Sequence, residues 1–522
     1  MARGRFERAS SASSDELFRG VVGRGTVPTA PVRPSAPAGE PAEPEADSKR
    51  FGRNFATTAF AQLVAQVLTL LVSVVLARKL GVAVYGVFVF GFAFPGWFLL
   101  LVSLGLDDVM SIQVAADRSR ASRYLTLVSL LRLLLAAFAI LALWVGTQLV
   151  LDDPTARTVT LILGVSSVVT TYATTFSSVF RAFERFEYAA LITIAERSVT
   201  VSAALVVMFL GFGLVEVSLA FLAGSFVMLI LSAVTARRKF AWFTRRVNAR
   251  EAKHIVKSAI PFGLNNVVAT FTYTTGIVLL TVMRDPESTG IFNAAFTLVL
   301  ALFSFLSIVS IAALPMMSRI NEQSWERLPS VLNQIQRLSL VIGVPMAFGG
   351  WLYAAPIITT FYGNAFLDSA QSFRVLILSF AVETAVMGIG PALAATGHMN
   401  VRLYIGAVGA AITMVLSALL IPPLGPVGVA YAFLASCIVV AVLSAAAIQR
   451  YVAQLRPIGT LGKSIFAGTV MALVLVVVPG LSLWIGVLFG GLVYFAALFS
   501  VRGMSAEDRI VLWNALRGAL FR

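Results

Sequence analysis

Four charged residues stand inside long apolar stretches of this sequence: Arg132, Glu196, Arg197 and Glu383. An ionisable side chain within a membrane-spanning helix is costly, so it usually faces a wet cavity or a partner and marks the pathway of a substrate or an ion. An arginine can hold a phosphate through two parallel hydrogen bonds, and a lone carboxylate can hold a proton or another cation. These residue types predict a site for an anionic group and a site for a cation.

Each of these residues also has a structural interpretation. Arg132 and Glu196 could pair with one another, which would leave Arg197 as the unneutralised cation of the first half of the chain. Glu383 could bind a cation, pair with Arg197, or remain a protonated structural acid. Arg132 and Arg197 are therefore substrate-binding candidates, and Glu196 and Glu383 are ion-coupling candidates. Arg78, near the outer end of its helix, is a further substrate candidate, with a snorkelling anchor as the alternative.

Polar side chains form a stripe along the first apolar helix, at spacings of three and four residues: Thr58, Gln62, Gln66, Thr69 and Ser73. In the first helix of the second half, Asn266, Thr270 and Tyr273 stand at the positions that correspond to Gln62, Gln66 and Thr69. Such stripes are unfavourable against lipid, so we expect both to face the space between the halves, where Gln62, Gln66, Asn266, Thr270 and Tyr273 could bind substrate. The alternative is that they only hydrogen-bond between helices.

The elements that carry these residues follow from composition. With 58% hydrophobic and 12% charged residues, the chain is a membrane protein. It contains about fourteen apolar runs long enough to cross a bilayer as helices. If the N-terminus is inside, most of the 40 Lys and Arg fall on the cytoplasmic side. This predicts a multi-pass protein of the cell membrane with both termini cytoplasmic. The net charge of +15 then faces anionic lipid headgroups, not nucleic acid.

Two sequence patterns occur twice. FGLVEVSLAFLAG at 212–224 returns as LGPVGVAYAFLAS at 424–436, and Tyr85-Gly86-Val87-Phe88 returns as Thr289-Gly290-Ile291-Phe292. The copies lie six helices apart, an even number, so both run in the same direction across the membrane. The expected fold is all-α, with two parallel six-helix lobes followed by two C-terminal helices.

The expected organisation is a disordered cytoplasmic tail at 1–48, a first lobe at 49–236, a basic interfacial linker at 237–257, a second lobe at 258–450, two further helices at 451–502 and an amphipathic cytoplasmic helix at 503–522. The tail is rich in proline and poor in large apolar residues, so it cannot bury enough surface to fold. In the linker, Phe240, Trp242 and Phe243 stand among basic residues, which predicts a short helix in the headgroup layer.

With its repeated Gly-x-Phe motif, its basic linker in mid-chain and its Gly-rich turn at 425–434, the chain resembles the polysaccharide transporter, or oligosaccharide flippase, family. The superfamily around it also holds multidrug and toxin extruders and lipid II flippases. The resemblance implies an alternating-access carrier that moves polyprenyl-linked oligosaccharide from the cytoplasmic to the outer leaflet. The partners it implies are the lipid-linked oligosaccharide, on a polyprenyl phosphate or diphosphate, and membrane lipids. A coupling cation, H⁺ or Na⁺, could be a further partner.

Two other classes remain as alternatives. A cation-coupled drug or toxin extruder shares the topology, although a proton-coupled one would typically carry an acid on the first helix, and none is present there. A membrane glycosyltransferase or polymerase needs sizeable outer loops, whereas the longest one expected here, at 354–372, holds only Asp368 as an acid. We therefore expect a protein that is not an enzyme and that uses no cofactor and no metal centre.

Overall fold

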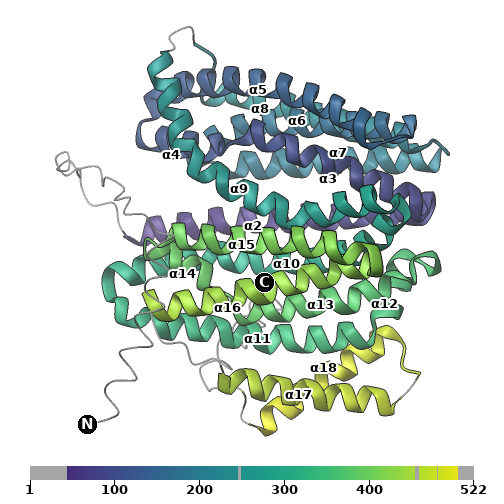
Figure 1. The fold of residues 1–522 in the computed structure, drawn as a ribbon. Helices are drawn as coiled ribbons and strands as arrows, with labels where there is room; N and C mark the ends of the chain where they lie inside the picture. The colour runs from purple at the N-terminus through teal and green to yellow at the C-terminus, as the bar shows by residue number, and fades with distance from the viewer. Residues whose placement is uncertain (1–43, 245–247, 453–457, 479, 502, 504–522) are drawn as a thin grey trace, which may run out of the picture. The chain divides into compact units, whose positions relative to one another are not determined.

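The computed structural model describes residues 44–244, 248–452, 458–478, 480–501 and 503 (Figure 1). The chain divides into two units, residues 1–52 and 53–522. In the first unit the described part is the beginning of α2, which spans Pro44–Leu80. Residues 44–48 therefore belong to a helix and not to the expected disordered tail, while 1–43 lie outside the described residues.

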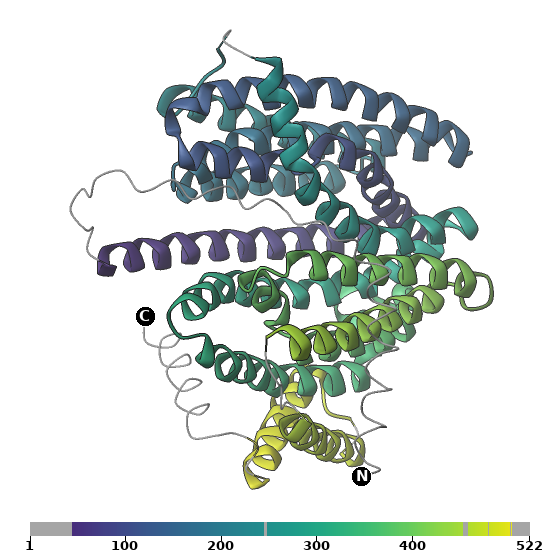
Figure 2. The same ribbon diagram turned by 60° about the vertical axis from the view of Figure 1, so that its left-hand side comes forward.

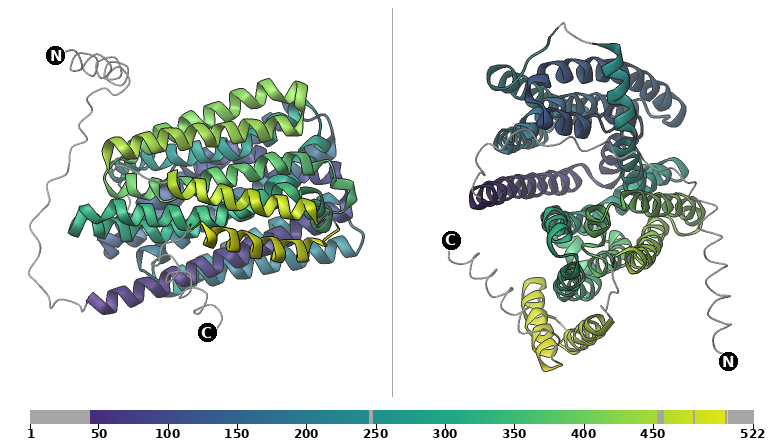
Figure 3. Two further views of the ribbon diagram at one scale, coloured as in Figure 1. Left: turned by 90° about the horizontal axis from the view of Figure 1, so that it is seen from below. Right: turned by 90° about the vertical axis from the view of Figure 1, so that its left-hand side faces the viewer.

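The second unit is built from helices that run nearly parallel or antiparallel to one another (Figure 3). After α2 they are α3 (Val82–Ser103), α4 (Leu106–Ala116), α5 (Ala121–Val150), α6 (Pro154–Ala182), α7 (Phe186–Phe209), α8 (Leu214–Lys239), α9 (Ala249–Met283), α10 (Pro286–Ser324), α11 (Leu328–Leu352), α12 (Ala354–Tyr362), α13 (Ser369–Ala385), α14 (Ile389–Ala395), α15 (Met399–Leu424), α16 (Pro426–Tyr451), α17 (Ile458–Val477) and α18 (Leu483–Ser500). Single 3₁₀ turns lie at Arg118–Arg120, Trp325–Arg327 and Asn364–Phe366.

Thirteen helical stretches of the described chain are long and apolar enough to cross a membrane, and Leu461–Val477 is a shorter apolar helix. This confirms the all-α, multi-pass fold class. Large apolar side chains remain exposed along many of these helices, as expected for surfaces that face lipid.

Two of the spans are broken helices. α3 and α4 form one span, interrupted where Leu104 and Gly105 adopt positive φ angles of 36° and 72°. α13 and α14 form another, interrupted before Gly388, whose φ is 84°. Glycine adopts this conformation without steric cost. Breaks within a membrane span leave backbone groups free for ligands or side chains, so both are candidate functional positions.

The helices pack in two sets that share α9. In the first set α6 packs against α3, α5 and α8, and α7 packs against α8. In the second set α13 packs against α10, α11 and α16, and α15 packs against α16. α9 contacts α3 and α4 of the first set as well as α15 of the second. The last two helices, α17 and α18, pack together, and both contact α11 (Figure 2).

The linker between α8 and α9 differs from the expected short helix. Residues 240–244 are not helical, and Phe240 and Trp242 pack onto the first set of helices. Trp242 stacks on Phe176 of α6, and Phe240 contacts Phe180 and Phe183. The physical reason is that aromatic rings gain more free energy by packing into a buried aromatic cluster than by projecting from a short exposed helix. The expected C-terminal helix at 503–522 falls almost wholly outside the described residues.

Candidate functional site

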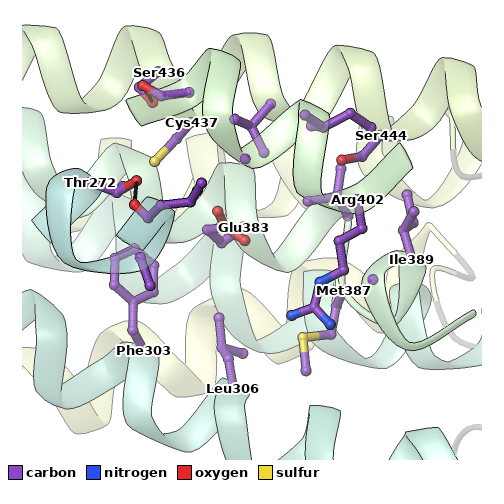
Figure 4. Close-up of a pocket in the computed structure, with 18 of the residues that line it drawn as sticks. Thr272, Phe303, Leu306, Glu383, Met387, Ile389, Arg402, Ser436, Cys437 and Ser444 are labelled. Atoms are coloured by element: carbon purple, nitrogen blue, oxygen red, sulfur yellow. Dashed lines mark hydrogen bonds between the residues drawn. The ribbon is translucent and has the colours of Figure 1, made fainter. Parts of the chain in front are cut away.

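A cavity of about 570 Å³ opens among α9, α10, α13, α14, α15 and α16 (Figure 4). Its walls are largely apolar, and a small set of polar side chains lines it: Asn265, Thr272, Tyr273, Glu383, Arg402, Ser436 and Ser444. Few polar groups in an apolar hollow are typical of a ligand site. The cavity also lies against the α13–α14 break, because Gly388, Ile389 and Gly390 contribute to its wall.

Glu383 is the acid of this cavity and comes five residues before Gly388, on the last turn of α13. Within the described chain, no hydrogen bond or ion pair reaches its carboxylate. The hydroxyls of Thr272 and Ser436 already donate to the carbonyl oxygens of Val268 and Gly409, each at 2.8 Å. Both hydroxyl oxygens can therefore still accept, and they line the same cavity as the carboxylate.

Arg402 is the basic residue that lines the same cavity. It stands near the start of α15, its side chain is exposed, and it runs beside Gly390, where an added Cβ would lie 3.5 Å from its Nε. Figure 4 shows Arg402 and Glu383 as separate side chains that line one space. The site therefore presents one positive and one negative group, with apolar surface such as Met387 and Leu306 beside them.

The structure places Arg132 with Asp107 and not with Glu196. Arg132 Nη2 lies 2.8 Å from Asp107 Oδ2, and the arginine side chain is completely buried. Its Nη1 donates to Thr171 O at 2.6 Å and to Thr175 Oγ1 at 2.5 Å, and its Nε donates to Val102 O at 3.3 Å. A guanidinium that is completely buried has no surface left for a substrate, so Arg132 holds the helix break between α3 and α4 together.

Glu196 and Arg197 are neighbours on α7 and approach one another. Arg197 Nε lies 3.4 Å from Glu196 Oε2. Glu196 is buried and accepts a hydrogen bond from Thr200 Oγ1 at 3.1 Å, whereas the side chain of Arg197 is 36% exposed. Arg197 is not among the residues around Glu383, so the alternative pair between those two is not formed in this conformation.

The two polar stripes have different surroundings. Gln62 and Gln66 of α2 line a small hollow of about 110 Å³ beside Ser304 of α10. On α9, Tyr273 lines the main cavity, while Thr270 faces α3, where its Cγ2 would lie 3.7 Å from a Cβ added at Gly96.

Asn266 stands on the same helix but is not part of the cavity wall, which uses Asn265 instead. Arg78, the other substrate candidate, donates from its guanidinium to the carbonyl oxygens of Thr360 and Phe361 at the end of α12. It therefore fastens two helices together at this end of the bundle.

Sequence reasoning missed Arg402, Thr272, Asn265 and Asp107. Arg402 stands next to the start of its helix, where a basic residue is expected to face the cytoplasm. Thr272 and Asn265 lie on the helix face next to the one that carries Asn266 and Thr270. Periodicity along one helix cannot tell which of two adjacent faces meets a cavity.

This fold is that of a multi-pass membrane transporter, as three solved structures show. The lipid II flippase MurJ in an inward closed conformation matches with a TM-score of 0.71 and 16% identity over 84% of this chain and 97% of its own. A multidrug resistance MATE family transporter of the MOP superfamily, in an inward-facing conformation, matches with a TM-score of 0.63 and 15% identity over 74% and 96%. A MOP superfamily transporter from Pyrococcus furiosus matches with a TM-score of 0.56 and 15% identity over 75% and 93%.

The family follows from the sequence. The family model described as "Polysaccharide biosynthesis protein" matches residues 51–321, more than half of the chain. The protein therefore belongs to the polysaccharide biosynthesis protein family, which confirms the expected resemblance. None of the curated protein sequences matches this chain.

Proposed function

We propose that this protein is an alternating-access carrier that moves polyprenyl-linked oligosaccharide from the cytoplasmic to the outer leaflet of the cell membrane. Its membership of the polysaccharide biosynthesis protein family carries the proposal, because a transporter fold in that family needs a glycan-bearing cargo. Transport without covalent change of the cargo fits a transporter fold, so we do not assign an enzymatic step.

Arg197 supports an anionic cargo. With Arg132 neutralised by Asp107, Arg197 is the other arginine that the sequence places deep within a span of the first half, and its side chain is 36% exposed. Only its Nε approaches Glu196. Among the described residues, its two terminal nitrogens have no hydrogen-bond or ion-pair partner. Those two nitrogens are the pair that would hold a phosphate through parallel hydrogen bonds. We assign Arg197 to the phosphate of the lipid carrier.

Glu383 supports coupling to a cation. A carboxylate in a membrane cavity without a donor is stabilised by taking up a proton or a metal cation, and the oxygens of Thr272 and Ser436 stand in the same cavity wall. We assign Glu383 to the coupling ion, H⁺ or Na⁺. The positive charge of Arg402 would repel a large organic cation from that cavity.

A cation-coupled drug extruder is the second candidate, and one correction favours it. A pair of Arg132 with Glu196 would leave Arg197 unneutralised, and that positive charge would repel a cationic drug. Asp107 pairs with Arg132, and Glu196 lies beside Arg197, so the formal charges of these four residues sum to zero. The likeness to a MATE family transporter is consistent with this candidate as well.

One experiment separates the two candidates. Proteoliposomes containing the purified protein would be given either a fluorescent polyprenyl-diphosphate oligosaccharide or a cationic dye, under the same ion gradient. We expect protein-dependent flipping of the lipid-linked sugar and no accumulation of the dye. Dye transport without sugar flipping would establish the extruder instead.

The orientation belongs to the same proposal. Both termini are placed in the cytoplasm because Lys and Arg are retained on that side of the membrane. Few basic residues are expected at the outer ends of the helices: Arg78, Lys79, Arg157, Arg284 and Arg374. The direction of flipping toward the outer leaflet rests on this orientation.

A further inference from the structure

The two copies of the repeated Gly-x-Phe motif meet in space. Gly86 stands near the start of α3 and Gly290 near the start of α10. A Cβ added at Gly86 would overlap the carbonyl oxygen of Pro286 and lie 3.0 Å from the amide nitrogen of Gly290. A Cβ added at Gly290 would overlap the carbonyl oxygen of Val82. The two helices therefore touch backbone to backbone, which only glycine permits at both positions.

The contact is reciprocal. Gly86 meets residue 286, and Gly290 meets residue 82, so the offset that relates Gly86 to Gly290 also relates Val82 to Pro286. A contact in which equivalent residues meet one another lies on a two-fold axis, here the approximate axis between the repeats. In carriers built from parallel repeats, the transport site lies at the interface around that axis. The glycine contact therefore stands across the expected pathway.

A buried hydrogen-bonded network lies directly beside this contact. The hydroxyl of Tyr85 lies 2.7 Å from Ser73 Oγ and accepts from Asn293 Nδ2 at 2.8 Å. Ser73 Oγ also lies 3.3 Å from the hydroxyl of Tyr362. Both tyrosines are 1% exposed. The network joins α2 and α3 to α10 and α12, and so ties the first set of helices to the second at the end of the bundle where α3 begins.

We propose that the contact between Gly86 and Gly290 is the outer gate of this carrier and that the Tyr85 network is its latch. The proposal rests on the proposed function, because it takes the pathway of the transported substrate to run between the two sets of helices. A backbone contact without side chains closes the gap fully, yet separates without any side chain having to withdraw. Each hydrogen bond of the latch contributes only about 1 kcal/mol net, so the closed state is releasable.

Cysteine labelling tests the gate without any substrate. The single cysteine, Cys437, is replaced by serine, and Gln66→Cys provides a probe on α2 about 10 Å from Ser73 toward the cytoplasm. Gly86→Ala and Gly290→Ala should each push α3 away from α10. We expect labelling of the probe by an impermeant maleimide, applied from outside, to rise about threefold or more in both variants, because the outward-open population increases.

The matched control is Gly96→Ala in the same helix. Its added carbon would stand 3.7 Å from Thr270 Cγ2, an ordinary contact, so labelling should stay at the parent level. An unchanged rate in folded Gly86→Ala and Gly290→Ala proteins would overturn the gate, and so would an equal rise in Gly96→Ala.

Tyr85→Phe tests the latch and covers the case in which the glycine variants do not reach the membrane. It keeps the ring packing and removes the bonds to Ser73 and Asn293. We expect a smaller but clear rise in labelling. The absence of a rise would contradict the latch. Where the glycine variants do not fold, it would contradict the gate as well. Because the readout needs no cargo, a protein that gates as described but flips no lipid-linked sugar would refute the proposed function and leave the gate standing.

Discussion

Arg132, which is completely buried, and Asp107, whose side chain is 21% exposed, form an ion pair that bridges a broken helix. The guanidinium on α5 lies 2.8 Å from the carboxylate on α4 and also donates to Val102 O, on the other side of the break. Thr174 and Ser178 donate to the same carboxylate at 2.9 and 3.0 Å. The pair thereby holds α3, α4, α5 and α6 in one arrangement.

Loss of Arg132 should therefore cost stability. Arg132→Ala takes the cation away from the Asp107 carboxylate and the donor away from the carbonyl oxygens of Val102 and Thr171. Breaking a fully buried pair costs about 3–5 kcal/mol, which is an upper value here because Asp107 keeps the hydroxyls of Thr174 and Ser178. We expect a marked drop in the thermal unfolding temperature of the detergent-solubilised protein and in its yield from membranes. Arg197→Ala is the comparison and should lower both less, because Arg197 makes one longer contact of 3.4 Å with Glu196, which keeps its hydrogen bond from Thr200. Equal stability of the two variants would show that Arg132 is not structural.

The orientation is checked by labelling from outside. A cysteine at Asn364, in the exposed turn after α12, should react with an impermeant reagent in intact cells. A cysteine at Arg250, exposed near the start of α9, should react only after the membrane is permeabilised. The reverse pattern would invert the topology and with it the direction of transport.

The coupling role of Glu383 predicts a separation of binding from transport. Glu383→Gln keeps the shape of the side chain and removes the charge that holds a cation. We expect unchanged binding of the lipid-linked sugar and loss of the part of transport that depends on an H⁺ or Na⁺ gradient. Glu216→Gln, which changes an acid on α8 outside the cavity, should transport normally. Full gradient-driven transport by Glu383→Gln would remove this assignment.

The sequence contained enough to predict the fold and part of the site. Long apolar runs define the membrane spans, and the repeated motifs around Gly86 and Gly290 indicated two related halves. Glu383 and Tyr273 were selected as single residues, and the structure brings both to one cavity. The partners of the charged residues were harder to predict. Arg132 pairs with Asp107 across a helix break, and that break depends on the φ angles of Leu104 and Gly105. A break in a continuous apolar run leaves little trace in periodicity.

Arg197 carries the central claim, because a partly exposed guanidinium whose terminal nitrogens have no partner among the described residues is the group that would recognise the phosphate of a polyprenyl carrier. Its loss should remove a charged hydrogen-bonding interaction of about 1.5–3 kcal/mol, equivalent to about a 10- to 100-fold change. Lysine would keep the charge but not the paired geometry. Arg374→Ala, at an exposed position beside Trp351, controls for loss of one positive charge.

The most direct measurement is the initial rate at which proteoliposomes flip a polyprenyl-diphosphate oligosaccharide, compared among the parent protein, Arg197→Ala, Arg197→Lys and Arg374→Ala at equal amounts of folded protein. We expect the rate of Arg197→Ala to fall about 10-fold or more, Arg197→Lys to recover part of it and Arg374→Ala to match the parent. A parental rate in a stable Arg197→Ala protein would contradict the account.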